Sequence, residues 1–283
     1  MLETVNLKKS LSKSAYQKAM PELQERLRKL QYATKAANVT TIVCLEGWDA
    51  AGKGPVVRKL TQKLDPRLFR VYPGTPPTPL EQRFHFLHRY QLNLPNYGEM
   101  AVFDHGWYRR VLEERCDKMV KKSEWRESYQ QINEFERWLS DDGQVVVKFW
   151  LHISKKKQKQ RFRKYLADPN LRWRITKDYL RHHSAYNKWI PAVEEMLAKT
   201  ETSYAPWTVI EANDQRWAFV RIFEVLAQRM ERELDRHSQK GSLPASAEKM
   251  SAQSQKTSRR KKRAKPASRA NGRHHEATEA ANA

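Results

Sequence analysis

A segment with buried-strand character, Thr41–Leu45, leads directly into a glycine loop, and this pairing limits the chain to few folds. Gly47, Gly52 and Lys53 fit the spacing G-x-x-x-x-G-K, which is meaningful when a strand precedes it and a helix follows it. In such a loop, backbone amides surround phosphate oxygens, the helix contributes its positive end, and the lysine neutralises a phosphoryl group. The spacing therefore predicts a phosphate site rather than a structural glycine turn.

Further strands and helices alternate along the chain. Strand character recurs at Phe69–Tyr72, Met100–Phe103, Val145–Leu151 and Thr208–Ile210. Helical spacing is expected over Pro21–Lys35, from Lys53 onward, and over Pro79–Leu92, Glu124–Leu139 and Asp214–Leu234. Strands that alternate with helices predict a parallel sheet covered on both faces. The expected fold class is α/β, a three-layer sandwich with a parallel five-stranded sheet.

The end of the sequence differs in composition from the rest. Residues 238–283 hold 11 Lys and Arg against 3 Asp and Glu, a net charge of +8, and have no aromatic residue. Such a segment cannot bury enough apolar surface to offset its ordering entropy, so we expect a disordered basic tail after a domain at residues 1–237. The cluster Arg259–Arg263 is either a solvated terminus or a contact for a polyanion. The whole chain carries +22, which leaves +14 on residues 1–237 and favours an anionic partner.

A long helical stretch at residues 154–199 separates the fourth and fifth expected strands. Its first part is strongly basic and holds no acid; its cations are Lys155, Lys156, Lys157, Lys159, Arg161, Arg163 and Lys164. Like charges this dense repel one another unless an anion binds, although a solvated helix face is the simpler interpretation of such a run.

The sequence also excludes several classes of protein. It has no apolar run long enough to span a bilayer and no apolar signal segment at its start, so we expect no membrane contact. Its two cysteines, Cys44 and Cys116, form no close-spaced ligand pattern, which argues against a disulfide scaffold or a zinc module. We therefore expect a cytoplasmic protein.

Two acids accompany the phosphate loop. The Ser or Thr that usually follows the loop lysine and holds magnesium is replaced by Gly54, but the loop itself carries Asp49. Asp104 ends the third expected strand, where a metal-binding Asp is found in phosphate-loop enzymes. Carboxylates at the carboxyl ends of neighbouring parallel strands can share a metal and a phosphate, and a strand-end cap is the alternative for Asp104.

Four separated segments, in order, resemble the polyphosphate kinase 2 family, and together they span about residues 39–230. They are the loop at Gly47–Gly54, the segment Phe103–Arg115, the stretch from Asp168-Pro169 to Arg172-Trp173-Arg174, and Tyr204–Trp207 followed by Glu211–Asp214. The loop and the Phe-Asp pair are most similar to the branch that uses AMP. The resemblance implies a P-loop kinase core with a helical lid at residues 154–199, and transfer of phosphoryl groups between inorganic polyphosphate and nucleotides.

The resemblance also implies roles for individual residues. Asp49, Lys53, Asp104 and His105 would be catalytic, and Asp49, Asp104 and Glu114 would hold Mg²⁺ or Mn²⁺. Phosphate or polyphosphate would contact Gly47, Ala50, Ala51, Gly52, Gly54, Arg109, Arg115, Arg161, Arg172 and Arg174. The nucleotide, AMP or ADP or their guanine counterparts GMP and GDP, would contact Arg89, Asn187 and Lys188. The family forms oligomers, so a homo-oligomer is expected.

The sequence departs from the family at several positions. His105-Gly106 stands where the family usually has Arg-Ser, and a histidine is charged at neutral pH only when a nearby anion raises its pKa. Asn187-Lys188 replaces an acidic pair, and His88 replaces a Trp ahead of the matching Arg89. Two other functions stay open: an ATP-dependent nucleotide kinase, and a catalytically impaired protein that binds polyphosphate or nucleic acid.

Overall fold

Five parallel strands form the centre of the structure, in the order β2-β3-β1-β4-β5. The computed structural model describes residues 2–241. The strands are β1 (Thr41–Gly47), β2 (Phe69–Pro73), β3 (Met100–Asp104), β4 (Val145–His152) and β5 (Trp207–Glu211). All five predicted strands are confirmed, and so is the α/β fold with a parallel five-stranded sheet. β1 and β4 are almost wholly buried, as strands covered on both faces must be.

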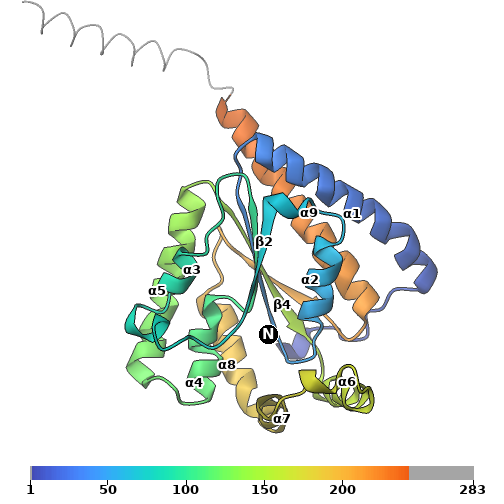
Figure 1. Cartoon of the computed structure of the whole chain (residues 1–283), viewed down its shortest axis with the longest axis vertical. Coiled ribbons are helices and arrows are strands. Elements are labelled where there is room, and N and C mark those ends of the chain that lie inside the picture. Colours follow the sequence, from blue (N-terminus) through green and yellow to red (C-terminus); the bar gives the residue numbers. More distant parts are fainter. Residues whose placement is uncertain (1, 242–283) are drawn as a thin grey trace, which may run out of the picture. The chain divides into compact units, whose positions relative to one another are not determined.

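Helices cover both faces of this sheet. Figure 1 shows α1, α2 and α9 to one side of the strands and α5 and α8 to the other, which makes three layers. The longer helices of the two outer layers are α1 (Lys13–Ala36), α2 (Lys53–Thr61), α5 (Lys122–Asp141), α8 (Tyr186–Lys199) and α9 (Gln215–Gly241). Short helices connect them: η1 (Leu2–Thr4), η2 (Pro66–Leu68), η3 (Glu81–Arg83), α3 (His88–Gln91), η4 (Trp107–Val111) and α4 (Glu113–Cys116).

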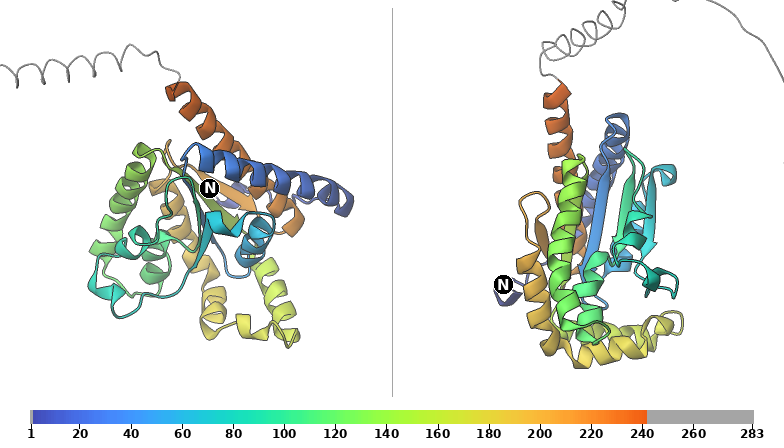
Figure 2. Two further views of the ribbon diagram at one scale, coloured as in Figure 1. Left: turned by 45° about the horizontal axis from the view of Figure 1, so that its top comes forward. Right: turned by 90° about the vertical axis from the view of Figure 1, so that its left-hand side faces the viewer.

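The insertion between β4 and β5 consists of two different parts. Residues 155–184, here called the lid, form α6 (Lys155–Ala167), η5 (Arg172–Arg174) and α7 (Lys177–Ser184). The right-hand view of Figure 2 shows the lid, in yellow, running across one end of the sheet. The following α8 buries Ala192, Val193, Met196 and Leu197 in the core. The expected lid at residues 154–199 is therefore too long, because α8 belongs to the body.

Three other predicted segments differ from the structure. Pro79–Leu92 forms only η3 and α3, because its apolar side chains do not share one buried face: Leu80 and Phe84 are exposed, whereas Leu87 and Tyr90 are buried. The first helix begins at Lys13 rather than Pro21, since Ser12 caps it through the amide of Ala15.

The last helix continues to Gly241, so Ser238–Gly241 are helical rather than part of a disordered tail. The remainder of the predicted tail, including Arg259–Arg263, lies outside the described residues. Within residues 2–241, no helix is both long and apolar enough to cross a membrane.

A fully buried ion pair joins α5 to the sheet. Lys148 Nζ on β4 lies 2.8 Å from Glu136 Oε2 on α5 and donates to the Thr200 carbonyl at 2.7 Å. The other oxygen of Glu136 accepts from Trp107 Nε1 at 2.9 Å and from the hydroxyl of Tyr108. Every charged atom of the pair therefore has a partner, which is the condition under which a buried pair is tolerated.

We expect Lys148→Met to lower the free energy of unfolding by about 3–5 kcal/mol, because it leaves the Glu136 carboxylate buried without its counter-charge. Adding Glu136→Gln removes that charge but keeps an acceptor for Trp107 and Tyr108, so the double variant should recover part of the loss. Urea unfolding of both variants measures this. A single variant within about 1 kcal/mol of the parent would contradict it.

The glycine loop after β1 is anchored to the end of β4 through Trp48. Its indole Nε1 donates to His152 Nδ1 at 3.1 Å, and its ring stacks on Tyr186 with centroids 4.1 Å apart. His152 must be neutral at Nδ1 to accept this bond. Burial accordingly lowers the pKa of His152 to about 4.

This histidine should make stability fall as the pH falls. An unfolded chain protonates His152 near pH 6.5, whereas the folded chain resists protonation until about pH 4, so acid favours unfolding between these values. We expect the parent to lose about 2 kcal/mol more than His152→Asn between pH 7 and pH 5, since Asn keeps an acceptor for Trp48 but does not titrate. Urea midpoints at the two pH values test this, and equal losses would refute it.

Candidate active site

A cavity of about 580 Å³ lies at the carboxyl ends of β1 and β3. It is bounded by the P-loop (residues 47–54), by the segment after β3, and by the lid. The P-loop contributes Asp49, Ala50, Ala51, Gly52, Lys53 and Gly54. The end of β3 and the segment after it contribute Asp104, His105, Arg109 and Glu113. The lid contributes Tyr165, Trp173, Arg174, Ile175, Thr176, Asp178, Tyr179 and His182.

The P-loop passes so close to β4 that its first residue must be glycine. A Cβ on Gly47 would lie 2.5 Å from the Leu151 carbonyl oxygen, and the φ of 146° is one that other residues rarely adopt. The amide of Trp48 donates to the same carbonyl at 3.3 Å. The sheet therefore sets the position of the loop.

Side chains donate hydrogen bonds to the main-chain carbonyls of the P-loop. Lys53 Nζ donates to the carbonyls of Gly47 and Trp48 at 2.7 and 3.3 Å. From the lid helix α6, Gln158 donates to the Asp49 carbonyl at 3.1 Å, and Arg161 donates to the carbonyls of Ala50 and Ala51 at 2.8 and 2.7 Å. Five consecutive carbonyl groups are thus bound within the protein.

The amides of the loop are left for a ligand. Among residues 2–241, no acceptor is assigned to the backbone N–H groups of Asp49, Ala50, Gly52 and Lys53. Free amides next to the first turn of a helix make an anion site, and Lys53 has one ammonium proton left after its two bonds to the loop. This geometry supports phosphate binding at Ala50, Gly52, Lys53 and their neighbours.

Asp49 and Asp104 both face the cavity. Asp104 Oδ1 is buried and has no hydrogen-bond partner within residues 2–241. Within the same residues, no three His, Cys, Asp or Glu side chains are grouped to hold a metal. Mg²⁺ is commonly held by one or two carboxylates together with substrate phosphates, and these two acids fit that pattern.

His105 lies between two carboxylates, in a backbone conformation with φ at 67°. Its Nδ1 is 3.5 Å from both Glu46 Oε2 and Glu113 Oε1. Burial and the charge of Lys53 lower the pKa of His105, but the two carboxylates outweigh them and raise it above its ordinary value. His105 also lines the cavity. Sequence analysis missed Glu46, although this buried acid directly precedes the P-loop.

Two adjacent acids in the segment after β3, Glu113 and Glu114, line different cavities. Glu113 lines the cavity and pairs with Arg109 at 2.5 Å, whereas Glu114 pairs with Arg110 at 2.9 Å and lines a separate, smaller cavity. Glu114 is thus placed away from Asp49 and Asp104, with which the resemblance grouped it as a metal ligand. The acid that shares their cavity is Glu113.

The five arginines expected to contact phosphate fall into two groups. Arg109 and Arg174 line the cavity, but Arg172 does not. Arg161 binds loop carbonyls, and burial lowers its pKa. Arg115 donates to the Tyr129 hydroxyl at 2.8 Å and pairs with Glu195 at 2.8 Å, so it connects the body helices instead of facing the cavity.

Arg89 lies between two smaller cavities near the main one. A cavity of about 160 Å³ contains Arg89 together with Gly74 and His105, which also line the main cavity. A cavity of about 110 Å³ contains Arg89 with aromatic and polar side chains: Phe84, Phe86, Tyr90, Trp107, Gln82 and Arg110. Asn187 and Lys188, also expected to contact nucleotide, are exposed on α8 and line none of these cavities.

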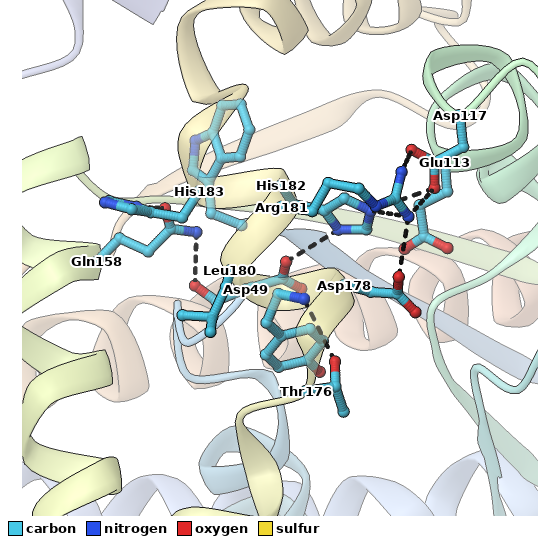
Figure 3. A network of polar contacts seen from close by, with 12 residues as sticks. Asp49, Glu113, Asp117, Gln158, Thr176, Asp178, Leu180, Arg181, His182 and His183 are labelled. Carbon is cyan, nitrogen blue, oxygen red and sulfur yellow. Dashed lines mark hydrogen bonds and ion pairs between the residues drawn. The ribbon is translucent and has the colours of Figure 1, made fainter.

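A pair of lid histidines, to which sequence analysis assigned no role, contacts the site. His182 Nδ1 lies 3.2 Å from Asp49 Oδ2, and its Nε2 lies 3.2 Å from Asp117 Oδ2. His183 Nδ1 lies 2.7 Å from Gln158 Oε1. Figure 3 shows His182 between Asp49 and Asp117, with His183 facing Gln158. Burial lowers the pKa of His182, but the two aspartates raise it overall.

Comparisons with known proteins identify the relatives of this chain. The family model "Polyphosphate kinase 2" matches residues 10–238. A polyphosphate:AMP phosphotransferase of Pseudomonas syringae pv. tomato is 36% identical over 240 residues, which are 85% of this chain and 48% of the relative. The NDP-polyphosphate phosphotransferase 1 of Ruegeria pomeroyi is 34% identical over 206 residues, 73% of this chain and 68% of the relative. The chain spans about half the length of the first of these relatives.

The structure also matches solved structures. The crystal structure of polyphosphate kinase 2 from Arthrobacter aurescens superimposes with a TM-score of 0.79 at 28% sequence identity, covering 82% of this chain and 85% of that one. The match to the family model extends over most of the chain, from before β1 to near the end of α9. This protein belongs to the polyphosphate kinase 2 family.

Proposed function

We propose that this chain transfers phosphoryl groups between inorganic polyphosphate and nucleotides, with AMP or another nucleoside monophosphate as the principal acceptor and a diphosphate as the second choice. The observation that carries the proposal is one cavity that combines free P-loop amides, Lys53, two aspartates and Arg174 of the lid. The named activities of the relatives from Pseudomonas syringae and Ruegeria pomeroyi support the same substrates.

The residues of the cavity divide the work of phosphoryl transfer. Free amides and Lys53 bind the non-reacting oxygens of the phosphate chain, and Arg109 and Arg174 balance charge on the transferred group. Asp49 and Asp104 hold Mg²⁺ or Mn²⁺, a role supported by the unpartnered Oδ1 of Asp104. When bound, the ion neutralises charge on the reacting phosphates. Positioning and charge balance, rather than a covalent enzyme intermediate, supply the rate.

The acceptor nucleotide extends from His105 toward Arg89. His105 lines both the main cavity and the one beside it, and Arg89 lines that second cavity and the aromatic one beyond. A nucleoside monophosphate placed along this row has its phosphate near His105 and its base near Phe84 and Phe86. Aromatic rings and an arginine are suitable partners for a planar base. Asn187 and Lys188 are exposed and line none of these cavities, so they are less favoured as contacts for the nucleotide.

The proposal includes a cellular location and an oligomeric state. The two cysteines, Cys44 and Cys116, are unpaired, which supports a reducing compartment such as the cytoplasm. The exposed apolar side chains Met119 and Trp138 are compatible with a homo-oligomer. A polyanion contact by Arg259–Arg263 stays a prediction.

The direct test is to incubate the purified protein with long-chain polyphosphate, Mg²⁺ and AMP, ADP, GMP or GDP, and to separate the products by ion exchange. We expect ADP from AMP, and we expect Lys53→Ala and Asp104→Asn each to lower the rate about 100-fold or more while circular dichroism stays unchanged. Product formed only with ATP as donor would indicate an ordinary nucleotide kinase. Polyphosphate binding with no product from any acceptor would indicate a binding protein.

Two arginines of the lid offer a matched pair of variants. Arg174 lines the cavity and Arg172 does not, although both are exposed and lie two residues apart. Arg174→Gln should lower the turnover number about tenfold or more, whereas Arg172→Gln should change it less than about threefold. Steady-state rates at saturating AMP and polyphosphate measure this. Equal effects would show that general lid charge, not a contact at the reacting group, is what matters.

A further inference from the structure

The lid makes two separate hydrogen bonds to one residue of the P-loop, Asp49. Asp49 is bound through its carboxylate, by His182 of α7, and through its main-chain carbonyl, by Gln158 of α6. Gln158 is in turn bound by His183 of α7. Adjacent residues of one lid helix therefore control both the side chain and the backbone of Asp49 (Figure 3).

The donor and acceptor groups present determine which atom donates in each hydrogen bond. Gln158 donates through its amide nitrogen to the Asp49 carbonyl, so its oxygen must accept, and His183 must donate from Nδ1. His182 Nδ1 faces the carboxylate of Asp49, which only accepts, so Nδ1 donates to it. His182 Nε2 lies 3.2 Å from Asp117 Oδ2 and 3.4 Å from Arg181 Nη2.

Burial protects these contacts from competition by water. Gln158 is 1% exposed and Asp49 is 8% exposed, so neither can exchange its protein partner freely for water. The ring of His182 also packs on Trp189 of α8, with centroids 4.4 Å apart, and its Nε2 contact fixes it to Asp117 in the body. The body thus holds His182 in place while His182 holds Asp49.

We infer that His182 and His183 are positioning residues that set the P-loop for phosphoryl transfer from the lid helix α7. The inference rests on the proposed function, because it concerns the placement of Asp49 and of the loop amides during that reaction. Both histidines act through other residues: His182 orients the Asp49 carboxylate, and His183 orients Gln158, which holds the Asp49 carbonyl. Misplacing such groups by a fraction of an ångström is costly in rate.

The two nitrogens of His182 allow a test that separates positioning from packing. The amide group of Asn overlays Nδ1 of histidine and that of Gln overlays Nε2. His182→Asn therefore keeps the donor to Asp49, and His182→Gln keeps only the donor to Asp117. At His183, Asn keeps the donor to Gln158, and Leu keeps the volume without it.

We expect His182→Gln and His183→Leu to lower kcat/KM for polyphosphate about tenfold, and both Asn variants to stay within about threefold of the parent. A packing role predicts the reverse order, because Gln and Leu fill more space than Asn. Equal rates for Asn and Gln at 182, or for Asn and Leu at 183, would overturn the inference. Ser184→Ala is the control, since Ser184 is an exposed residue of the same helix whose hydroxyl donates to the Leu180 carbonyl at 3.0 Å.

Amide hydrogen exchange of residues 47–56 provides a readout that does not need turnover. Ala51 donates to the Trp48 carbonyl at 2.9 Å, so loosening of the loop speeds its exchange. Faster exchange in His182→Gln and His183→Leu than in the Asn variants supports the inference, and equal exchange refutes it. A parent protein with no transfer to any nucleotide would refute the proposed function, and the exchange comparison would still decide the inference.

Discussion

The carbonyl groups of the P-loop need partners other than phosphate, and this requirement organises the site. A loop that presents its N–H groups to an anion must direct its carbonyls away from it, into the protein, where an unpaired acceptor is costly. Lys53, Gln158 and Arg161 provide the donors for residues 47–51. Two of these donors come from the lid helix α6, about 110 residues further along the chain. The phosphate site is therefore complete only when the lid helix is docked on the loop.

This dependence gives the basic lid helix two distinct faces. Gln158 and Arg161 lie one helical turn apart and are buried against the loop, whereas Lys156, Lys159, Arg163 and Lys164 are exposed. The buried face preorganises the loop, and the exposed face carries the charge that attracts a polyanion. A run of seven cations in the sequence does not reveal this division, because Arg161 differs from its neighbours only in where the helix turns it.

Local sequence patterns predicted the strands and the P-loop of the site. They did not predict the residues that reach the site through long-range contacts. The five strands, the P-loop and the pairing of Asp49 with Asp104 follow from hydrophobic runs and a motif with known spacing, and the structure places both acids on one cavity. The continuous helix expected over Pro79–Leu92 is absent because only part of its apolar pattern, Leu87 and Tyr90, is buried, whereas Leu80 and Phe84 are exposed. Glu46, His182 and Gln158 were missed because their partners are far away in sequence, and no spacing rule connects residues 46, 158 and 182. Of these, only Glu46 had a local signal, as a charged residue between the predicted strand Thr41–Leu45 and the P-loop.

The charge balance at the reacting centre differs from that of the chain as a whole. The protein carries +22, yet four carboxylates line the main cavity: Asp49, Asp104, Glu113 and Asp178. Three of them are bound to His182, Arg109 or Arg181, which leaves Asp104 as the acid with an unpartnered buried oxygen. Pairing of this kind keeps the groups fixed before substrate arrives, so little reorganisation is needed during transfer. Under the proposed function, the exposed lid cations attract the polyanion, whereas the paired groups of the cavity, together with Asp104, complete their contacts only with a phosphate or a divalent ion.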